Sequence, residues 1–267
     1  MTGGTMVESL VLSRKDGAIG AVSLNRPDHL NAFNLELANQ FIEAVNAFGV
    51  DPDVRVIMIR GTGKVFSAGG DIKEMLGYVR EGVDRAAYFR APLAAFGKMV
   101  MAVRESPKPV IAAVHGAVAG VAFNLMLACD LKLAEENTRF TQACIKIGLS
   151  PDGGGTWFLP RLIGHARACE LAMLPSEIDA KTAQDWGLIN WIAPAVTFEA
   201  RLNKICKMLI NGPREALQRA KLLLNSAYNR DLIQHMGAER LAQVENAAHA
   251  DFEEGLTAFI ERRKPEF

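Results

Sequence analysis

The sequence predicts an α/β core of roughly 190 residues followed by a helical C-terminal segment. In the first part of the chain, a β-rich apolar run, a small-residue loop and a helical pattern recur at a period of about fifty residues. After Gly155 the pattern changes, and most segments show the apolar spacing of helices. We therefore assign residues 1–195 to the core and residues 196–267 to the helical segment.

The first elements of the core are a hairpin, a helix and a buried strand. Strands are expected at 7–12 and 19–24, on either side of turn-forming residues 15–17. Apolar residues at helical spacing predict a helix over 35–48, and a Val/Ile-rich run predicts a buried strand over 54–59.

The later core should contain strands at 111–114 and 131–134, with a short apolar helix at 122–128 between them. A short strand and linker are expected at 189–195. Helical patterns beyond Gly155 cover residues 165–174, 179–187, 197–210, 213–228 and 239–263.

Composition excludes several classes of function. The 267 residues are 49% hydrophobic and 22% charged, as in ordinary globular proteins, and their formal net charge is zero. Neither nucleic acid nor an anionic membrane is therefore an expected partner. The four cysteines form no C-x-x-C pair or His-spaced pattern, so we expect free thiols and no metal site. Without a secretory, transit or membrane-spanning pattern, the expected location is the cytoplasm.

Two glycine-rich turns are the most informative motifs. One covers 65–72 (V-F-S-A-G-G-D-I) and the other 115–122 (H-G-A-V-A-G-V-A), and each follows a β-rich run. Small residues let a ligand approach the backbone closely. Two such turns facing each other can give two N–H groups to one carbonyl oxygen, which is an oxyanion hole. The expected chemistry therefore passes through an enolate or a tetrahedral oxyanion.

These motifs and others in the same order resemble the crotonase (enoyl-CoA hydratase/isomerase) superfamily. The stretches that carry the resemblance are F-S-A-G-G-D-I-K-E-M, P-K-P-V-I-A-A-V-H-G-A-V-A-G, A-C-D-L-K-L-A and G-L-S-P-D-G-G. The resemblance implies a crotonase-like spiral of ββα repeats. It also implies a helical tail that covers the active site or packs on a neighbouring subunit, in a homotrimer or a hexamer built as a dimer of trimers.

The resemblance also implies a catalytic site. Alignment places the two oxyanion-hole donors at the backbone N–H groups of Ala68 and Val121. Hydratases of this family use two glutamates to activate water, but the corresponding positions here hold Asn124 and Cys144. Neither residue replaces a paired acid and base near neutral pH. Isomerase-like members instead carry a carboxylate in the loop that here contains Asp152, whose alternative role is that of a turn or helix N-cap residue.

The acyl-CoA substrate itself carries the CoA, so no separate cofactor is expected. The positions that the resemblance assigns to CoA are Arg26, His29, Leu30, Ala68, Gly70, Asp71, Ile72, Phe259 and Lys264. For Arg26 and Asp71, roles as a surface residue and a helix cap are equally open. A second acid or base could come from the segment holding Glu74, Glu81 and Asp84, among which the sequence does not choose.

The leading hypothesis is an acyl-CoA isomerase that shifts a double bond or opens a ring through an enolate held in the oxyanion hole. One alternative is an enoyl-CoA hydratase or hydrolase of unusual mechanism. Another is a non-catalytic CoA-binding paralogue. The acyl group is not specified by the sequence.

Overall fold

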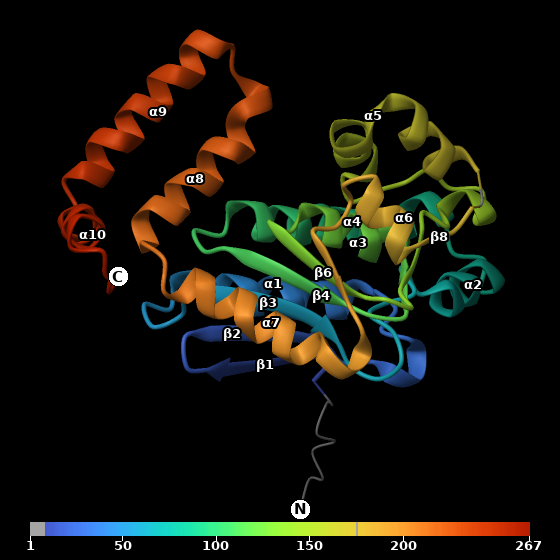
Figure 1. Cartoon of the computed structure of the whole chain (residues 1–267). Coiled ribbons are helices and arrows are strands. Elements are labelled where there is room, and N and C mark those ends of the chain that lie inside the picture. The colour runs from blue at the N-terminus through green and yellow to red at the C-terminus, as the bar shows by residue number, and fades with distance from the viewer. Residues whose placement is uncertain (1–8, 175) are drawn as a thin grey trace, which may run out of the picture.

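A computed structural model describes residues 9–174 and 176–267 (Figure 1). Its centre is a six-stranded sheet in the order β1-β2-β3-β4-β6-β9, in which β1 is antiparallel to β2 and the later neighbours are parallel. These strands are β1 Val11–Asp16, β2 Ile19–Leu24, β3 Val56–Gly61, β4 Val110–Val114, β6 Leu131–Glu135 and β9 Trp191–Ala193. A second, three-stranded sheet contains β5 Ala117–Ala119, β7 Arg139–Thr141 and β8 Ile178–Asp179.

Helices cover both faces of the larger sheet. The described helices are α1 Leu35–Val50, α2 Ile72–Arg80, α3 Arg85–Glu105, α4 Gly120–Ala128, α5 Gly155–Met173, α6 Ala180–Asp185, α7 Ala195–Ile210, α8 Arg214–Ser226, α9 Leu232–Ala247 and α10 Ala250–Glu261, with 3-10 turns η1 Pro27–His29, η2 Cys144–Ile147 and η3 Ala227–Asn229. Every residue of β4 is buried. Ile111 packs in the cluster that contains Leu202 of α7, whereas Ala112 packs in the cluster with α1, α3 and α4. Because successive strand side chains point to opposite faces, the sheet lies between two helical layers, as parallel sheets usually do.

The structure confirms the predicted α/β core and helical C-terminal region, but the first strand lies later than predicted. β1 covers 11–16 rather than 7–12, and residues 7–8 lie outside the described residues. Pairing of Asp16 with Ile19 makes Gly17, at φ 56°, part of the hairpin turn. β1 is an edge strand with five consecutive exposed residues. Its sequence therefore lacks the apolar alternation that locates a half-buried strand.

The helical segment differs from the prediction at two points. α5 begins at Gly155, ten residues before the predicted 165, because non-helical Gly164 (φ 76°) interrupts the pattern within it. The predicted helix over 239–263 is two helices, α9 and α10, with His249 as the N-cap of the second. In the described part of the chain, no helix is both long and apolar enough to pass through a bilayer.

The predicted boundary at residue 195 separates α7 from the sheet that it covers. Phe198 and Leu202 of α7 are buried with Ile111 and Leu133 of the sheet. The elements that leave the core are instead α8, α9 and α10, which project from one end of the sheet (Figure 1). α8 remains attached through buried Lys221, whose ammonium contacts Asp130 at 2.9 Å.

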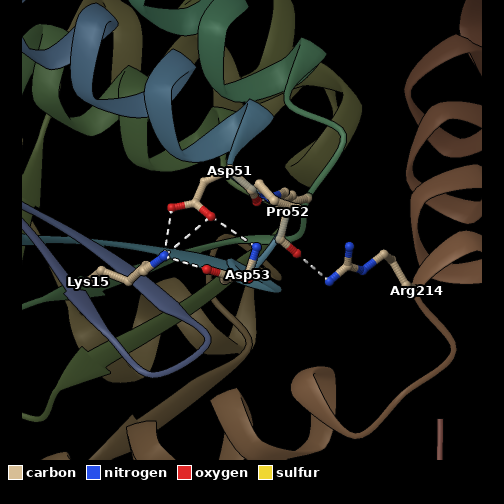
Figure 2. A network of polar contacts seen from close by, with 6 residues as sticks. Lys15, Asp51, Pro52, Asp53 and Arg214 are labelled. Carbon is tan, nitrogen blue, oxygen red and sulfur yellow. Dashed lines mark hydrogen bonds and ion pairs between the residues drawn. The ribbon is translucent and has the colours of Figure 1, made fainter.

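Polar contacts at that end of the sheet hold the start of α8 (Figure 2). Arg214 donates to the Pro52 carbonyl at 2.7 Å, and Lys15 contacts the carboxylates of Asp51 and Asp53 at 3.1 and 2.8 Å. The hairpin, the loop before β3 and the start of α8 are thereby joined. This network lies at the end of the sheet away from α2, beside which the cavity described below is found (Figure 1).

Candidate active site

The two glycine-rich turns meet in the folded chain. Ser67 and Val118 form a parallel bridge between them. Gly69 has φ 92° and Gly120 has φ 51°, backbone conformations that favour glycine. A Cβ atom on Gly69 would lie 2.8 Å from the Ala119 carbonyl oxygen, so any larger residue would push the turns apart. The sequence prediction that these turns face each other is confirmed.

Among the described residues, several backbone N–H groups of these turns have no partner, and those of Val121 and Gly70 are two of them. Val121 lies in the first turn of α4, whose N-cap Ala119 supplies no side-chain acceptor. The first N–H groups of a helix have no partner within it. Among the described residues, the Gly70 N–H also donates to no recorded acceptor, although the N–H groups of Ala68 and Gly69 do.

Ala68 therefore does not fulfil its predicted role as a donor. Its N–H already donates to the Leu30 carbonyl at 3.0 Å. The N–H of Gly70, two residues later, has no recorded acceptor among the described residues. Ala68, Gly70 and Val121 all line the same cavity.

That cavity has a volume of ≈ 200 Å³ and opens between the glycine turns, α2, α3 and the loop before α5. Its wall is mostly apolar. The apolar side chains that form it are Phe33, Ile72, Met75, Phe89, Pro92, Phe96, Val121, Ile147 and Leu149. Asp152 and Cys144 also line it, so the structure brings the predicted carboxylate to the predicted oxyanion turns.

Asp152 does not cap the helix that follows its loop. The N-cap of α5 is Gly154, at φ 82°, and no side chain caps this helix. One carboxyl oxygen of Asp152, Oδ1, is buried without a hydrogen-bond partner. Burial raises the pKa of this carboxyl above its ordinary value. A half-buried carboxyl group with a raised pKa, in a cavity, is what proton transfer near neutral pH requires.

Asn124 holds the Asp152 loop in place. Its side chain is fully buried, donating to the Asp152 carbonyl at 2.8 Å and accepting from Gln142 Nε2 at 2.8 Å. Gly155 packs directly against this amide, where a Cβ atom would overlap it. Asn124 is thus a neutral brace rather than an acid or base. Gln142 is a part of this arrangement that no sequence motif pointed to.

Cys144, at the other position where hydratases carry glutamate, is a thiol at neutral pH. Burial raises its pKa to about 11, and the nearby Asp152 carboxylate acts in the same direction. A group that stays protonated cannot serve as a general base. The two side chains that replace the hydratase glutamates therefore lack the charge needed to activate water.

Two of the residues assigned to CoA form a structural ion pair. The Arg26 guanidinium contacts Asp71 Oδ2 at 3.0 Å, with the two side chains only 11% and 7% exposed. Arg26 also donates to the Ala32 carbonyl at 2.6 Å, and Asp71 caps α2 by accepting from the Glu74 N–H at 3.1 Å. This pair fixes the loop beside the cavity.

The other predicted CoA positions fall into two groups. His29, Leu30 and Ile72 are about half exposed, and Ile72 lines the cavity. Phe259 is 85% exposed on α10, and Lys264 follows that helix. Figure 1 places α10 on the opposite side of the molecule from α2. Within one chain, Phe259 and Lys264 are therefore far from the cavity.

The three candidates for a second acid or base have different environments. Asp84 caps α3 by accepting from the Ala86 and Ala87 N–H groups. Glu81 is exposed at the end of α2. Glu74 alone of the three contacts a side chain of the cavity wall, because it accepts from the Tyr88 hydroxyl at 3.3 Å. The sequence offered no motif for Tyr88, which lies in an ordinary helical stretch.

Comparisons with known proteins agree with this geometry. Residues 14–267 match the model of the family described as enoyl-CoA hydratase/isomerase. The chain is 33% identical to "1,2-epoxyphenylacetyl-CoA isomerase" of Escherichia coli K12, over 96% of this chain and 97% of that protein. It is 34% identical to "Probable enoyl-CoA hydratase" of Rhodobacter capsulatus, over 93% and 94%.

Solved structures show the same fold. The crystal structure of an enoyl-CoA hydratase from Polaromonas sp. JS666 superposes with a TM-score of 0.89 at 36% identity, covering 96% of this chain and 98% of that one. The names of the relatives include both isomerase and hydratase, so they establish the family without choosing the reaction. The chain belongs to the enoyl-CoA hydratase/isomerase (crotonase) family.

Proposed function

We propose that the protein is an acyl-CoA isomerase that moves a proton through an enolate intermediate. The N–H groups of Gly70 and Val121 bind the thioester carbonyl oxygen. The Asp152 carboxylate takes a proton from the acyl chain, and the electron pair of that C–H bond moves into the enolate. Returning the proton to another carbon shifts the double bond. Where a strained ring lies beside the enolate, the enolate electron pair instead breaks a ring bond, and the proton goes to the released ring atom. The unpartnered, buried carboxyl oxygen of Asp152 beside the two free N–H groups is the observation that carries this proposal.

The free N–H groups lower the barrier because charge develops on the thioester oxygen. Removing one such donor typically costs ~2.7–4 kcal/mol of transition-state stabilisation. The reaction is neutral in redox terms and consumes no water, so it requires neither a redox cofactor nor a metal. Among the described residues, no cluster of three or more potential metal-binding side chains is found.

Isomerisation is favoured over hydration by what surrounds the cavity. Hydration needs a water activated by an acid and a base, and Asn124 and Cys144 offer neither near neutral pH. The relative named as an epoxyphenylacetyl-CoA isomerase indicates the kind of substrate, an unsaturated or strained acyl-CoA. The aromatic rings of Phe33, Phe89 and Phe96 in the cavity wall suit a flat acyl group.

Binding of CoA is proposed at the mouth of the cavity, beside His29, Leu30 and Ile72. In a homotrimer or hexamer, Phe259 and Lys264 of a neighbouring subunit would complete this site. The exposed apolar side chains of α9 and α10 support such an assembly, since Ile233 is 83% exposed and Phe259 is 85% exposed.

Proton exchange tests the proposal. The protein is incubated with enoyl-CoA thioesters in deuterated water, and deuterium in the acyl chain is measured by mass spectrometry. Asp152→Asn should bind the thioesters but exchange ~10²–10⁴-fold more slowly, the range for loss of a general base. Asp84→Asn, outside the cavity wall, is the matched control and should exchange normally. Exchange at the parental rate in Asp152→Asn, or efficient hydration of crotonyl-CoA by the parent, would refute the proposal.

A further inference from the structure

The α2–α3 side of the cavity carries a polar side chain that the proposed proton transfer does not use. Tyr88 of α3 lines the cavity, and its hydroxyl donates to Glu74 Oε1 at 3.3 Å. Glu74, on α2, is not part of the described cavity wall and so holds the phenol from outside it. Tyr78 stacks on Tyr88 with ring centroids 4.1 Å apart, which restrains the ring further.

The direction of this hydrogen bond decides what Tyr88 offers to a ligand. A phenol has one proton to donate and lone pairs to accept with. Because the proton is directed at Glu74, the oxygen keeps its lone pairs for a donor group of a ligand. Burial and the adjacent Glu74 carboxylate raise the pKa of Tyr88 to about 12, so the group stays a neutral phenol. Donation to a carboxylate also makes the phenol oxygen a better acceptor.

Most of the cavity wall is apolar, with Phe33, Met75, Phe89 and Phe96 among its side chains. Its polar side chains besides Tyr88 are Asn34, Cys144, Lys146 and Asp152. A hydroxyl group brought there loses its bonds to water, which is costly unless a protein group replaces them. The Tyr88 oxygen can replace one of these bonds by accepting a hydrogen bond from the hydroxyl group. A ketone or ether oxygen on the ligand cannot donate a hydrogen bond, so it gains no affinity from the Tyr88 oxygen.

We infer that Tyr88 is a specificity-determining residue that accepts a hydrogen bond from a hydroxyl group on the acyl chain, and that Glu74 is its positioning residue. This inference rests on the proposed binding of acyl-CoA in the cavity. It narrows the substrate class from acyl thioesters in general to hydroxylated acyl thioesters.

Matched ligands test this recognition. Saturated CoA thioesters of one carbon skeleton are prepared with no substituent, with a hydroxyl group, or with a ketone at each successive carbon from the third onward. Dissociation constants are measured by calorimetry. At the carbon that reaches Tyr88, the parent should bind the hydroxy ester about tenfold tighter than the plain ester, the effect of one buried neutral hydrogen bond.

Variants separate the two roles. In Tyr88→Phe the ratio of the two dissociation constants should fall to about one, whereas in Tyr78→Phe, which keeps the stacked ring, it should persist. Glu74→Ala frees the phenol proton to donate to a ligand, so the keto ester should gain affinity and the preference for the hydroxy ester over the keto ester should shrink. A packing role for Glu74 would not raise the affinity for the keto ester alone.

Several results would overturn the inference. These are a parent without preference at any carbon, a preference that survives Tyr88→Phe, and a Glu74→Ala protein whose preference for hydroxyl over ketone equals that of the parent. Deuterium exchange on a plain enoyl-CoA is measured in the same preparations. Exchange that depends on Asp152, together with no hydroxyl preference, refutes this inference alone. If no thioester binds, the proposed function fails as well.

Discussion

Replacing Asn124 by alanine should both destabilise the protein and disturb its proposed base. The side chain is fully buried and makes two hydrogen bonds of 2.8 Å, to Gln142 and to the Asp152 carbonyl. Truncation leaves the Gln142 amide without its partner, at ~1–3 kcal/mol, and removes one of two hydrogen bonds to the Asp152 carbonyl, which still accepts from the Gly155 N–H, at ~0.5–1.5 kcal/mol. The expected loss is therefore about 1.5–4.5 kcal/mol, toward the lower end if water enters the vacated space. Proton exchange should slow as well, because the Asp152 loop loses its tether.

Urea unfolding followed by circular dichroism gives the loss in stability. Asn225→Ala is the matched control, because Asn225 makes a single recorded hydrogen bond, 2.8 Å to the Arg104 carbonyl, and is half-buried. That variant should lose only about 0.5–1.5 kcal/mol, the net value of one hydrogen bond. If Asn124→Ala is no less stable than Asn225→Ala, the paired, buried amide does not brace the loop and the reasoning fails.

Asp152→Asn should raise the melting temperature at pH 7, because burial raises the Asp152 pKa and the folded state is penalised for the charge. The penalty on the folded parent develops as pH rises through the raised pKa of Asp152, so the gain in melting temperature should vanish in acid. A variant less stable than the parent at pH 7 would contradict this prediction. Arg26→Met should cost about 3–5 kcal/mol in urea unfolding, since it leaves Asp71 buried and unpaired. Adding Asp71→Asn should recover part of that loss, and strictly additive losses would disprove the coupling. Gly155→Ala should cost about 1–3 kcal/mol by thermal unfolding, because the new Cβ overlaps the Asn124 amide.

Gly97→Ala is the control for the last of these substitutions. Gly97 lies within α3, and no heavy atom is within 4 Å of a Cβ placed there. Alanine is the better helix former by about 1 kcal/mol, so this variant should be neutral or more stable. If Gly155→Ala and Gly97→Ala changed thermal stability equally, overlap of the new Cβ atom with the Asn124 amide would have no effect on stability.

Local patterns in the sequence determined the fold class, the family motifs and the region of the site. Apolar spacing, a property of neighbouring residues, predicted a helix over 35–48 and a strand over 111–114, and the structure has α1 Leu35–Val50 and β4 Val110–Val114 there. The glycine turns were recognisable because Gly69 and Gly120 need backbone conformations that favour glycine. Asp152 could be named because the loop motif around it is continuous in the chain.

Tertiary structure decided which groups in those regions are free to act. Ala68 and Gly70 are both small residues of one turn. The folded chain pairs the Ala68 N–H with the carbonyl of Leu30, 38 positions earlier, and gives the Gly70 N–H no recorded acceptor. The Arg26 guanidinium is likewise held in an ion pair with Asp71, a residue that only the folded chain brings next to it.

The partners of Asn124 and Tyr88 likewise come from other elements of the chain. Gln142 and the Asp152 loop reach Asn124 across 18 and 28 residues, and Glu74 reaches Tyr88 from α2. A sequence pattern records which donors and acceptors exist. Whether each one is satisfied depends on contacts between distant segments, which form only when the chain packs.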